Sequence, residues 1–315
     1  MLLACSQGVL PEKEAQERDI MLCSMTKAGG DAQAEQTPVF MFWLDGDQDK
    51  FGSETVQPYF ISKPSGVVDD YKTTPYNTGY PYPENTLIYA NGYCPSTLVA
   101  DEDSDPFTGL TVPQDMLGYV DITASEGFVQ GSADAPFEAD ADQTMKFEHL
   151  LSKVNFKARL GDIPAERYFR GVRIVVAGKD VFTDRIEWGA DDRYSAASTT
   201  ASEDVIWSAV DANTNQMDPN EADPREIGSV YIHPGQEKIV FDIEVEMSET
   251  VTFESSEFIN ARATVAFVGP DSRRTLDAGE EYDITITVLY DSFVFVGNKA
   301  MWQEGGKIPL PFYPD

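Results

Sequence analysis

The segment IVFDIEVEM, residues 239–247, alternates apolar and acidic side chains with a period of two. Its odd-numbered residues are apolar, whereas residues 242, 244 and 246 are acidic. A strand sends successive side chains to opposite faces, so this pattern predicts a β-strand with one buried and one solvated face. Such strands are typical of antiparallel sheets, which we expect here.

The same alternation recurs elsewhere in the second half of the chain, in residues 154–160, 261–267 and 282–290. Gly-Pro and Asp-Ala-Gly turns separate these segments, and no amphipathic helix of three turns interrupts them. In the first half, VFMFWL (39–44) is apolar on both faces, which predicts a strand buried on two sides. TLIYANGYCP (86–95) is the clearest further strand. We therefore predict an all-β fold built from two β-sandwiches.

The composition limits the classes of partner. The chain has 315 residues, enough for about two domains of ordinary size. Its 54 acidic and 23 basic residues give a net charge of −31, which repels phosphate backbones and anionic lipid surfaces. We therefore expect no nucleic-acid partner. No apolar run reaches the roughly 18 residues of a membrane-spanning helix.

The chain opens with MLLACSQG, in which two leucines and an alanine precede Cys5. This is the residue order of a bacterial lipoprotein cleavage site, where the cysteine carries lipid. A secretory signal needs a basic start and an apolar region of about 7–15 residues, more than precedes Cys5. We therefore expect the true start to lie further upstream. The alternative is an ordinary cytosolic N-terminus with an accidental cysteine.

Three segments follow from these patterns. Residues 1–36 are assigned to a truncated lipoprotein signal, a tether and an N-terminal leader strand, because residues 6–19 are polar and charged and only 20–25 form an apolar run. Residues 37–142 are predicted to form the N-terminal sandwich. Residues 143–315 are predicted to form the C-terminal sandwich, since a long polar connection ends near residue 142.

No catalytic motif stands out in the sequence. His149 and His233 are about 80 residues apart, and neither G-x-S-x-G, H-E-x-x-H nor a glycine-rich phosphate loop occurs. Sparse histidine with abundant aromatic residues suits a β-rich packing protein better than an acid/base catalyst. We expect no enzymatic activity and no cofactor.

Two aspartate-rich runs resemble the start of a calcium loop. In DGDQDKFG (45–52) the aspartates have the spacing of oxygen ligands at positions 1, 3 and 5, but Lys50 stands where glycine is needed and Val56 where a glutamate should be. The run at 101–105 ends at Pro106. We expect solvated turns rather than a metal site.

The remaining cysteines and a group of tyrosines each allow two interpretations. The spacing of Cys23 and Cys94 matches neither a zinc site nor a redox motif, and two buried thiols are favoured over a disulfide between them. Tyrosines cluster in the first half of the chain, where we favour packing over stacking on sugar rings: Tyr71, Tyr76, Tyr80 and Tyr82.

Four stretches together resemble the fimbrillins, the lipoprotein subunits of type V pili. YPYPENTLIYANGYCP (80–95) is similar to the family's aromatic and proline-rich strand, and KFEHLLSKVNFKARL (146–160) to its F-x-H-x-L-x-K strand. LDAGEEYDITITV (276–288) followed by VFVGNKAMWQEGG (294–306) resembles its closing hairpin. With the residues before Cys5, these matches span almost the whole chain. They mark five residues as structural positions of the family's motifs: Phe147, His149, Lys153, Tyr282 and Trp302.

The resemblance implies two transthyretin-like Greek-key sandwiches, export to the outer membrane as a lipoprotein anchored at Cys5, and assembly into a surface fimbrium. In the family, a protease cuts after an arginine or lysine, the leader strand leaves, and a strand of the next subunit fills the groove. The candidate cut sites here are Arg18 and Lys27. A cut after Lys27 removes the leader strand, represented by Ile20, Leu22 and Ser24, whereas a cut after Arg18, the residue type that the family prefers, retains it. The alternative is a tip or anchor subunit that is not processed and keeps its leader.

The C-terminal residues bear on the position in the fimbrium. QEGGKIPLPFYPD (303–315) contains three prolines, which suit a donor strand poorly. We therefore favour a tip or accessory subunit over a stalk subunit. The expected partners are other subunits, added by β-strand exchange, and an unidentified surface ligand. The alternative function is a surface lipoprotein that binds glycans.

Overall fold

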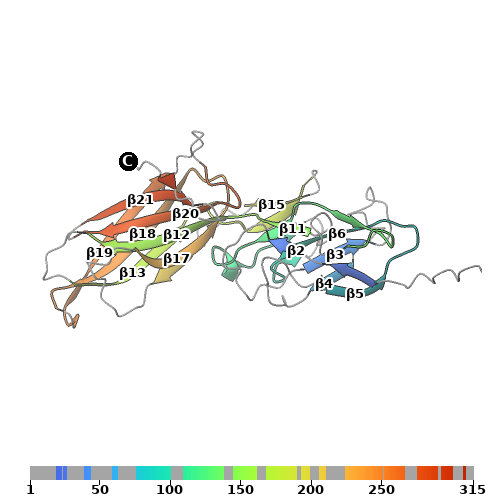
Figure 1. Cartoon of the computed structure of the whole chain (residues 1–315). Helices are drawn as coiled ribbons and strands as arrows, with labels where there is room; N and C mark the ends of the chain where they lie inside the picture. Colours follow the sequence, from blue (N-terminus) through green and yellow to red (C-terminus); the bar gives the residue numbers. More distant parts are fainter. Residues whose placement is uncertain are drawn as a thin grey trace, which may run out of the picture.

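The computed structural model describes residues 19–22, 24–26, 39–43, 59–62, 76–100, 109–137, 145–161, 168–189, 193–198, 206–210, 224–250, 252–266, 275–289, 292–300 and 308–309. Within these ranges the regular structure consists of β-strands and one short 3₁₀ helix, η2 (Gln114–Met116). The prediction of an all-β chain is confirmed. The described ranges contain no helix that is long and apolar enough to cross a membrane. Two lobes lie end to end (Figure 1).

The C-terminal lobe is a sandwich of two sheets. One sheet has the order β17-β12-β20-β21-β22, and the other has the order β16-β13-β18-β19. The strands of this lobe are β12 (Ser152–Leu160), β13 (Tyr168–Ala177), β16 (Ile206–Val210), β17 (Arg225–Ile232), β18 (Lys238–Ser248), β19 (Ser256–Ala266), β20 (Glu281–Val288), β21 (Phe293–Ala300) and β22 (Ile308–Pro309). The alternating segments 154–160, 239–247 and 282–290 thus lie within or overlap three long strands, as predicted.

Aromatic side chains from both sheets fill the space between them. The Phe156 and Phe241 rings meet edge to face with centroids 5.0 Å apart, and Trp207 stacks on Phe156 at 5.7 Å. All three side chains are at most 2% exposed. Each buried ring of this size contributes about 1.5–3 kcal/mol relative to an exposed one.

Among the described strands of the C-terminal lobe, one pairing differs from the expected antiparallel order. Strands β12 and β20 run parallel over eight residue pairs, from Lys153 with Glu281 to Leu160 with Val288. The alternation of side chains reports which face is buried but carries no information about the direction of the neighbouring strand, so the prediction of antiparallel sheets is wrong for this pair.

The N-terminal lobe is built around a seven-stranded sheet of order β2-β11-β9-β6-β3-β4, with β10 also paired to β6. Its strands are β2 (Ser24–Thr26), β3 (Val39–Trp43), β4 (Tyr59–Ser62), β6 (Ile88–Cys94), β9 (Thr123–Ser125), β10 (Val129–Gly131) and β11 (Met145–His149). Strand β6 is buried at every residue, which fits its place inside the sheet. The segment 86–95 therefore contains the predicted strand.

Smaller sheets cover both faces of the central sheet. On one face lies a two-stranded sheet of β1 (Asp19–Leu22) and β5 (Tyr76–Pro81). Ile20 of β1 packs there in a buried cluster with Phe42 and Ile88. The other face packs Val39 and Met41 against a four-stranded sheet, β15-β14-β8-β7. Strand β3 is therefore buried on two sides, as its sequence predicts. The added strands are β7 (Val99–Ala100), β8 (Gly109–Thr111), β14 (Arg185–Trp188) and β15 (Tyr194–Ala197).

The two lobes are interleaved in sequence. Strands β14 and β15 come between β13 and β16 of the C-terminal lobe, yet β14 pairs with β8 of the N-terminal lobe. The chain therefore passes between the lobes three times, near residue 150, before β14 and after β15 (Figure 1). Strand β11, beyond the boundary predicted at residue 142, also pairs with β9. Both pairings join strands on opposite sides of the predicted boundary at residue 142. The division of the chain into domains stays a prediction.

Candidate functional site: the leader segment and the sheet edge it covers

The predicted leader segment forms two short strands on different sheets. Strand β1 pairs antiparallel with β5, with Met21 opposite Asn77 and Leu22 opposite Tyr76. Strand β2 pairs parallel with β11, with Ser24 opposite Met145. Ile20 and Leu22 thus lie on β1, and Ser24 lies on β2. One segment of eight residues bridges the two-stranded sheet and the central sheet.

Ile20 anchors this segment in the interior of the lobe. Its side chain is 0% exposed. It belongs to a cluster of buried residues drawn from several strands: Phe42, Tyr82, Ile88, Ala90, Cys94, Phe137, Met145 and Phe147. Full burial of an isoleucine side chain contributes about 1.5–3 kcal/mol. The buried Ile20 side chain therefore contributes to holding the leader in the lobe.

Strand β2 is the outermost strand of the central sheet next to β11. Only three residue pairs join the two strands, from Met145 with Ser24 to Phe147 with Thr26. If β2 left, the β11 backbone on that side would lose its partner and become able to accept another strand. The Met145 and Phe147 side chains, both 1% exposed, would then border the vacated position.

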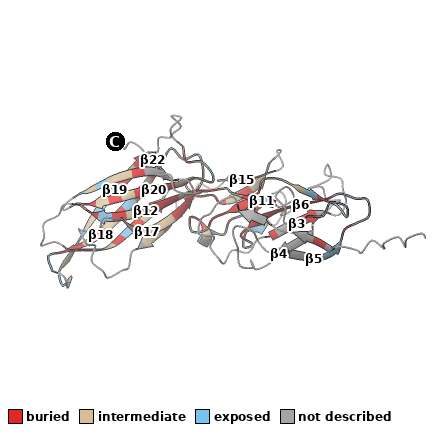
Figure 2. Ribbon diagram, in the orientation of Figure 1, coloured by how far each residue is buried: buried red, intermediate tan, exposed pale blue. Residues whose placement is uncertain are grey.

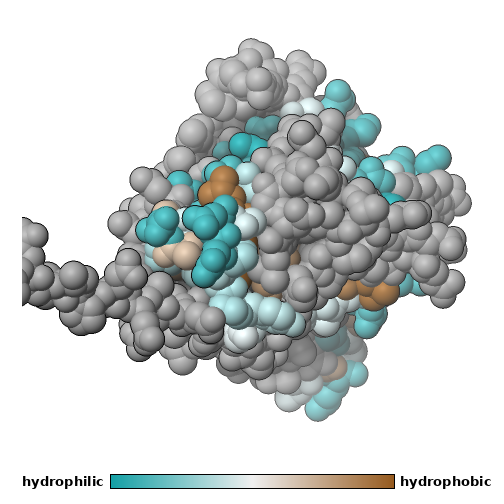
Figure 3. All heavy atoms as spheres, turned by 90° about the vertical axis from the view of Figure 1, so that its right-hand side faces the viewer, coloured by the Kyte–Doolittle hydropathy of each residue, from teal (hydrophilic) through white to brown (hydrophobic). Residues whose placement is uncertain are grey.

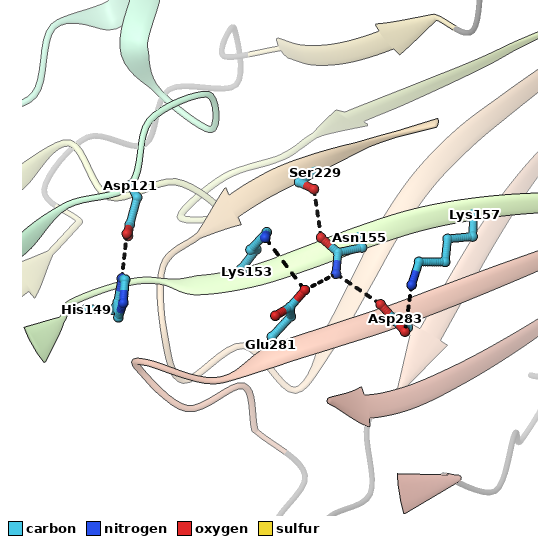
Figure 4. Close-up of polar contacts among 8 residues, drawn as sticks. All are labelled: Asp121, His149, Lys153, Asn155, Lys157, Ser229, Glu281 and Asp283. Carbon is cyan, nitrogen blue, oxygen red and sulfur yellow. Dashed lines mark hydrogen bonds and ion pairs between the residues drawn. The ribbon is translucent and has the colours of Figure 1, made fainter. Parts of the chain in front are cut away.

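Phe147 and His149, the first two motif residues, lie on β11. The Phe147 side chain packs in the same cluster as Ile20. His149 Nδ1 lies 2.5 Å from Asp121 Oδ2, and the two side chains are 11% and 12% exposed. Asp121 precedes β9, so this contact joins the end of β11 to the neighbouring part of the sheet (Figure 4).

Lys153 belongs to a polar network across the parallel β12 and β20 pair. Its Nζ lies 3.6 Å from Glu281 Oε1. Asn155 accepts a hydrogen bond from Ser229 Oγ at 2.7 Å and donates to Asp283 Oδ1 at 2.9 Å, and Lys157 Nζ lies 2.9 Å from Asp283 Oδ2 (Figure 4). Asn155 and Asp283 are 3% and 2% exposed. The network supplies partners for buried polar groups, which would otherwise be costly to bury.

Tyr282 is buried at the start of β20, and its hydroxyl accepts a hydrogen bond from the Asp277 backbone N–H at 3.0 Å. Burial raises the pKa of Tyr282 to about 12, so the phenol is neutral at physiological pH. Phe147, Lys153 and Tyr282 therefore occupy packing or pairing positions. Their assignment to the family's motifs remains a prediction.

Several predicted residues lie outside the described part of the chain. These are the lipidation candidate Cys5, the cut-site candidates Arg18 and Lys27, and the motif residue Trp302. Cys23, Tyr71 and the aspartate-rich runs at 45–49 and 101–105 also fall there. Among the residues that are described, no group of three His, Cys, Asp or Glu side chains could hold a metal ion.

The tyrosine group divides between packing and exposure. Tyr82 is 8% exposed, and its hydroxyl accepts a hydrogen bond from the Phe137 N–H at 2.7 Å. Tyr80 is 39% exposed but meets the Phe42 ring edge on, with centroids 5.6 Å apart. Leu87, in the turn after β5, is 45% exposed. The described surface at this end of the lobe is mostly hydrophilic, with small hydrophobic patches (Figure 3).

His233 follows β17 and contacts the segment that leads from β13 to β14. Its Nδ1 lies 3.0 Å from Thr183 Oγ1, and its backbone N–H donates a hydrogen bond to the Val181 carbonyl oxygen at 2.9 Å. Burial lowers the pKa of His233, although Asp184 and Asp180 oppose this effect. His149 contacts Asp121, whereas His233 contacts Thr183. The two histidines therefore do not share a site.

Cys94 should be chemically inert in the folded protein. Burial, reinforced by the negative charge of Asp121, raises the pKa of its thiol to about 12. Because the thiolate is the reactive species, iodoacetamide at pH 8 should leave Cys94 unmodified until the protein is unfolded in guanidinium. Peptide mass spectrometry after reduction measures the labelling. Equal labelling rates in the folded and unfolded protein would contradict this prediction.

The hairpin β14–β15 was not found by sequence reasoning. Ile186 on β14 and Leu110 on β8 are both 0% exposed and lie opposite each other in the pairing. Tyr194 on β15 packs edge to face on Trp188 at 4.8 Å and on Tyr93 of β6 at 6.1 Å. The only available signal was the apolar residues in RIEW and YSAA, which are too few to show a period.

Comparisons with known proteins find the same fold in solved structures. No family model and no curated protein sequence matches the chain. A "putative cell adhesion protein" from Bacteroides uniformis ATCC 8492 has the same fold with a TM-score of 0.52 at 13% identity, over 90% of this chain and 99% of that one. A fimbrial protein from Bacteroides vulgatus ATCC 8482 has a TM-score of 0.50 at 11% identity, over 90% of this chain and 99% of that one. The chain therefore shares its overall fold with these two proteins.

Proposed function

We propose that this protein is an adhesive or structural subunit of a cell-surface fimbrium that assembles by strand exchange. The observation that carries the proposal is the leader segment. It forms the outermost strand beside β11 through three residue pairs, and it is held in the lobe by the buried Ile20. A strand attached in this way is suited to leave and be replaced. The shared fold with a cell adhesion protein and a fimbrial protein supports the same role.

The position of the strands favours one of the two cut sites. Arg18 precedes β1, so a cut there leaves both β1 and β2 attached to the lobe. Lys27 follows β2, so a cut there separates both strands from it. We therefore propose Lys27 as the processing site, with Cys5 as the lipid anchor of the exported precursor at the outer membrane.

The C-terminal strand supports a tip or accessory position. Strand β22 pairs with β21 of its own lobe through only two residue pairs, Asn298 with Pro309 and Lys299 with Ile308. Pro309 has no N–H to donate, and two further prolines follow. Such a segment would pair poorly as the donor strand of a neighbouring subunit. A subunit that accepts a strand without donating one would end a fibre.

Limited trypsin digestion of two variants tests the processing site. Wild type and Arg18→Ala should both lose the leader by a cut after Lys27, whereas Lys27→Ala should retain residues 19–26. N-terminal sequencing of the product identifies the cut. Loss of the leader from Lys27→Ala by a cut elsewhere, or a wild-type cut only after Arg18, would contradict Lys27 as the processing site.

The same samples test strand exchange when they are mixed with a processed stalk subunit. The cleaved protein should accept a donor strand and run as an SDS-resistant adduct, and Lys27→Ala should remain a monomer. The cleaved protein alone should give no ladder if it is a tip subunit. A ladder from the cleaved protein alone would favour a stalk position, and monomers in every mixture would refute strand exchange.

A further inference from the structure

The outer face of the sheet β16-β13-β18-β19 carries ordered rows of side chains. Cross-strand pairing places Arg173, Glu244 and Asn260 in one row. The next row contains Val175, Asp242 and Arg262. The opposite faces of the same strands supply the core, as shown by the buried Ile174, Ile243 and Val245. Figure 2 shows exposed residues along β18 and β19.

This face is hollowed where the two rows meet. The hollow has a volume of about 410 Å³ and is lined by both arginines, both carboxylates and the amide of these rows. Pockets that hold small ligands have volumes of about 300–1,000 Å³. Ala261 also borders the hollow, although its side chain lies on the core face of β19, opposite Ile243. The size suits one or two sugar rings.

A β-bulge in β13 borders the hollow. The pairing of β13 with β18 shifts between Arg170 and Arg173, and Gly171 has φ +63°, a conformation that favours glycine. Bulges bend the strand and increase its local twist, and they occur often beside functional sites. The bulge therefore accounts for a concave face where a regular sheet would be flatter.

The charges in the hollow are balanced, although the whole chain carries −31. Arg173 and Arg262 offset Asp242 and Glu244, and Arg262 Nε lies 3.9 Å from Asp242 Oδ1. Guanidinium groups only donate hydrogen bonds, ionised carboxylates only accept them, and the Asn260 amide does both. A ligand whose hydroxyl groups both donate and accept matches this arrangement, whereas a charged ligand leaves one pair of ions unsatisfied.

Phe258 lies on the same face, one row beyond Asn260. It is paired with Glu246 of β18 and is 56% exposed, the greatest exposure of any phenylalanine in the described part of the chain. Large aromatic side chains normally bury most of their surface. An exposed ring at the border of a polar hollow is suited to stack on the apolar face of a sugar ring while the hydroxyl groups contact the hollow.

We propose that this face binds a neutral oligosaccharide, with the ring of Phe258 as the stacking platform and Arg173, Asp242, Glu244, Asn260 and Arg262 as hydrogen-bonding groups. The site lies on the C-terminal lobe and uses no residue of the leader or of β11. It therefore does not depend on strand exchange, and it gives the protein a ligand whether or not it is assembled.

Affinity electrophoresis of the whole protein tests the proposal. Native gels contain mannan, dextran or galactan as the neutral probe, and heparin as the anionic one. At least one neutral polysaccharide should retard the wild type. Phe258→Ala should weaken the apparent affinity by about tenfold, as expected for a central contact residue. Asn260→Asp, which removes the donor at nearly constant shape, should also weaken it. Thermal melting confirms that each variant is folded.

Two matched variants locate the site. Tyr80→Ala removes a partly exposed tyrosine of the N-terminal lobe, and Val294→Ala removes a 45% exposed residue of the other sheet. Both should bind as wild type, and so should Lys27→Ala, which separates this result from the test of processing. The proposal is overturned by no retardation in any neutral gel, retardation by heparin alone, unchanged binding of Phe258→Ala, or loss of binding in Tyr80→Ala.

Discussion

Ile186→Asp should prevent the N-terminal lobe from folding, although residue 186 lies between two strands of the C-terminal lobe in the sequence. Ile186 is 0% exposed on β14 and lies opposite Leu110 of β8. A carboxylate there would be buried without a charged partner, so we expect a loss of more than about 4 kcal/mol in the free energy of unfolding. Guanidinium denaturation followed by tryptophan fluorescence and near-UV circular dichroism measures it.

A substitution in the same hairpin provides the control. Ser195 on β15 is exposed, so Ser195→Asp introduces the same charge without burying it and should change the stability by no more than about 0.5 kcal/mol. A chain shortened to end at residue 150 should also fail to fold, because it lacks the hairpin. A folded, protease-resistant fragment of residues 19–150 would show that β14 and β15 are dispensable and would contradict the prediction.

The sequence patterns were most reliable where one face of a long strand packs against a core. Segment 239–247 became β18 because its odd-numbered residues face the other sheet, and all of them are buried. The segment 39–44 was equally clear, since apolar residues on both faces require two covering layers. Here Met41 joins one cluster and Phe42 the other. In both cases the local pattern of apolar residues reports a local property, namely which faces of the strand are buried.

Properties that depend on distant partners were not predicted. The strands RIEW and YSAA have four residues each, too few for a period, and β8, the strand that pairs with RIEW, lies about 75 residues earlier in the chain. The parallel direction of β20 beside β12 was not predicted either, because it depends on how two strands far apart in the sequence meet. Asn155 and Asp283 were expected on a wet face, but charged neighbours on adjacent strands bury them.

The candidate site was predicted in part. An apolar run between two polar stretches marked residues 20–25 as a strand, and the structure places residues 20–22 on β1 and residues 24 and 25 on β2. The division into two strands on two sheets could not be read from so short a run. The hollow on the outer face of β13, β18 and β19 could not be read either, because its polar residues have the same period as any solvated strand face.

Ile20→Ala should loosen the hold of the N-terminal lobe on the leader. The side chain is fully buried among residues from β3, β6 and β11. Truncating a buried isoleucine to alanine costs about 2–5 kcal/mol, and the loss would fall on the N-terminal lobe alone. Residues 19–26 should then exchange their amide protons faster than the strands they contact. Hydrogen exchange with mass spectrometry measures this peptide by peptide.

Leu87→Ala is the matched control, because Leu87 is 45% exposed and lies in the turn between β5 and β6. It should change the free energy of unfolding by no more than about 0.5 kcal/mol. The free energy of opening that exchange reports for residues 19–26 should change as little. If Ile20→Ala behaves like Leu87→Ala, the leader is held by its backbone pairing with β5 and β11 rather than by the buried Ile20 side chain. Release would then require those pairings to break together, and cutting after Lys27 alone would not free the edge of β11.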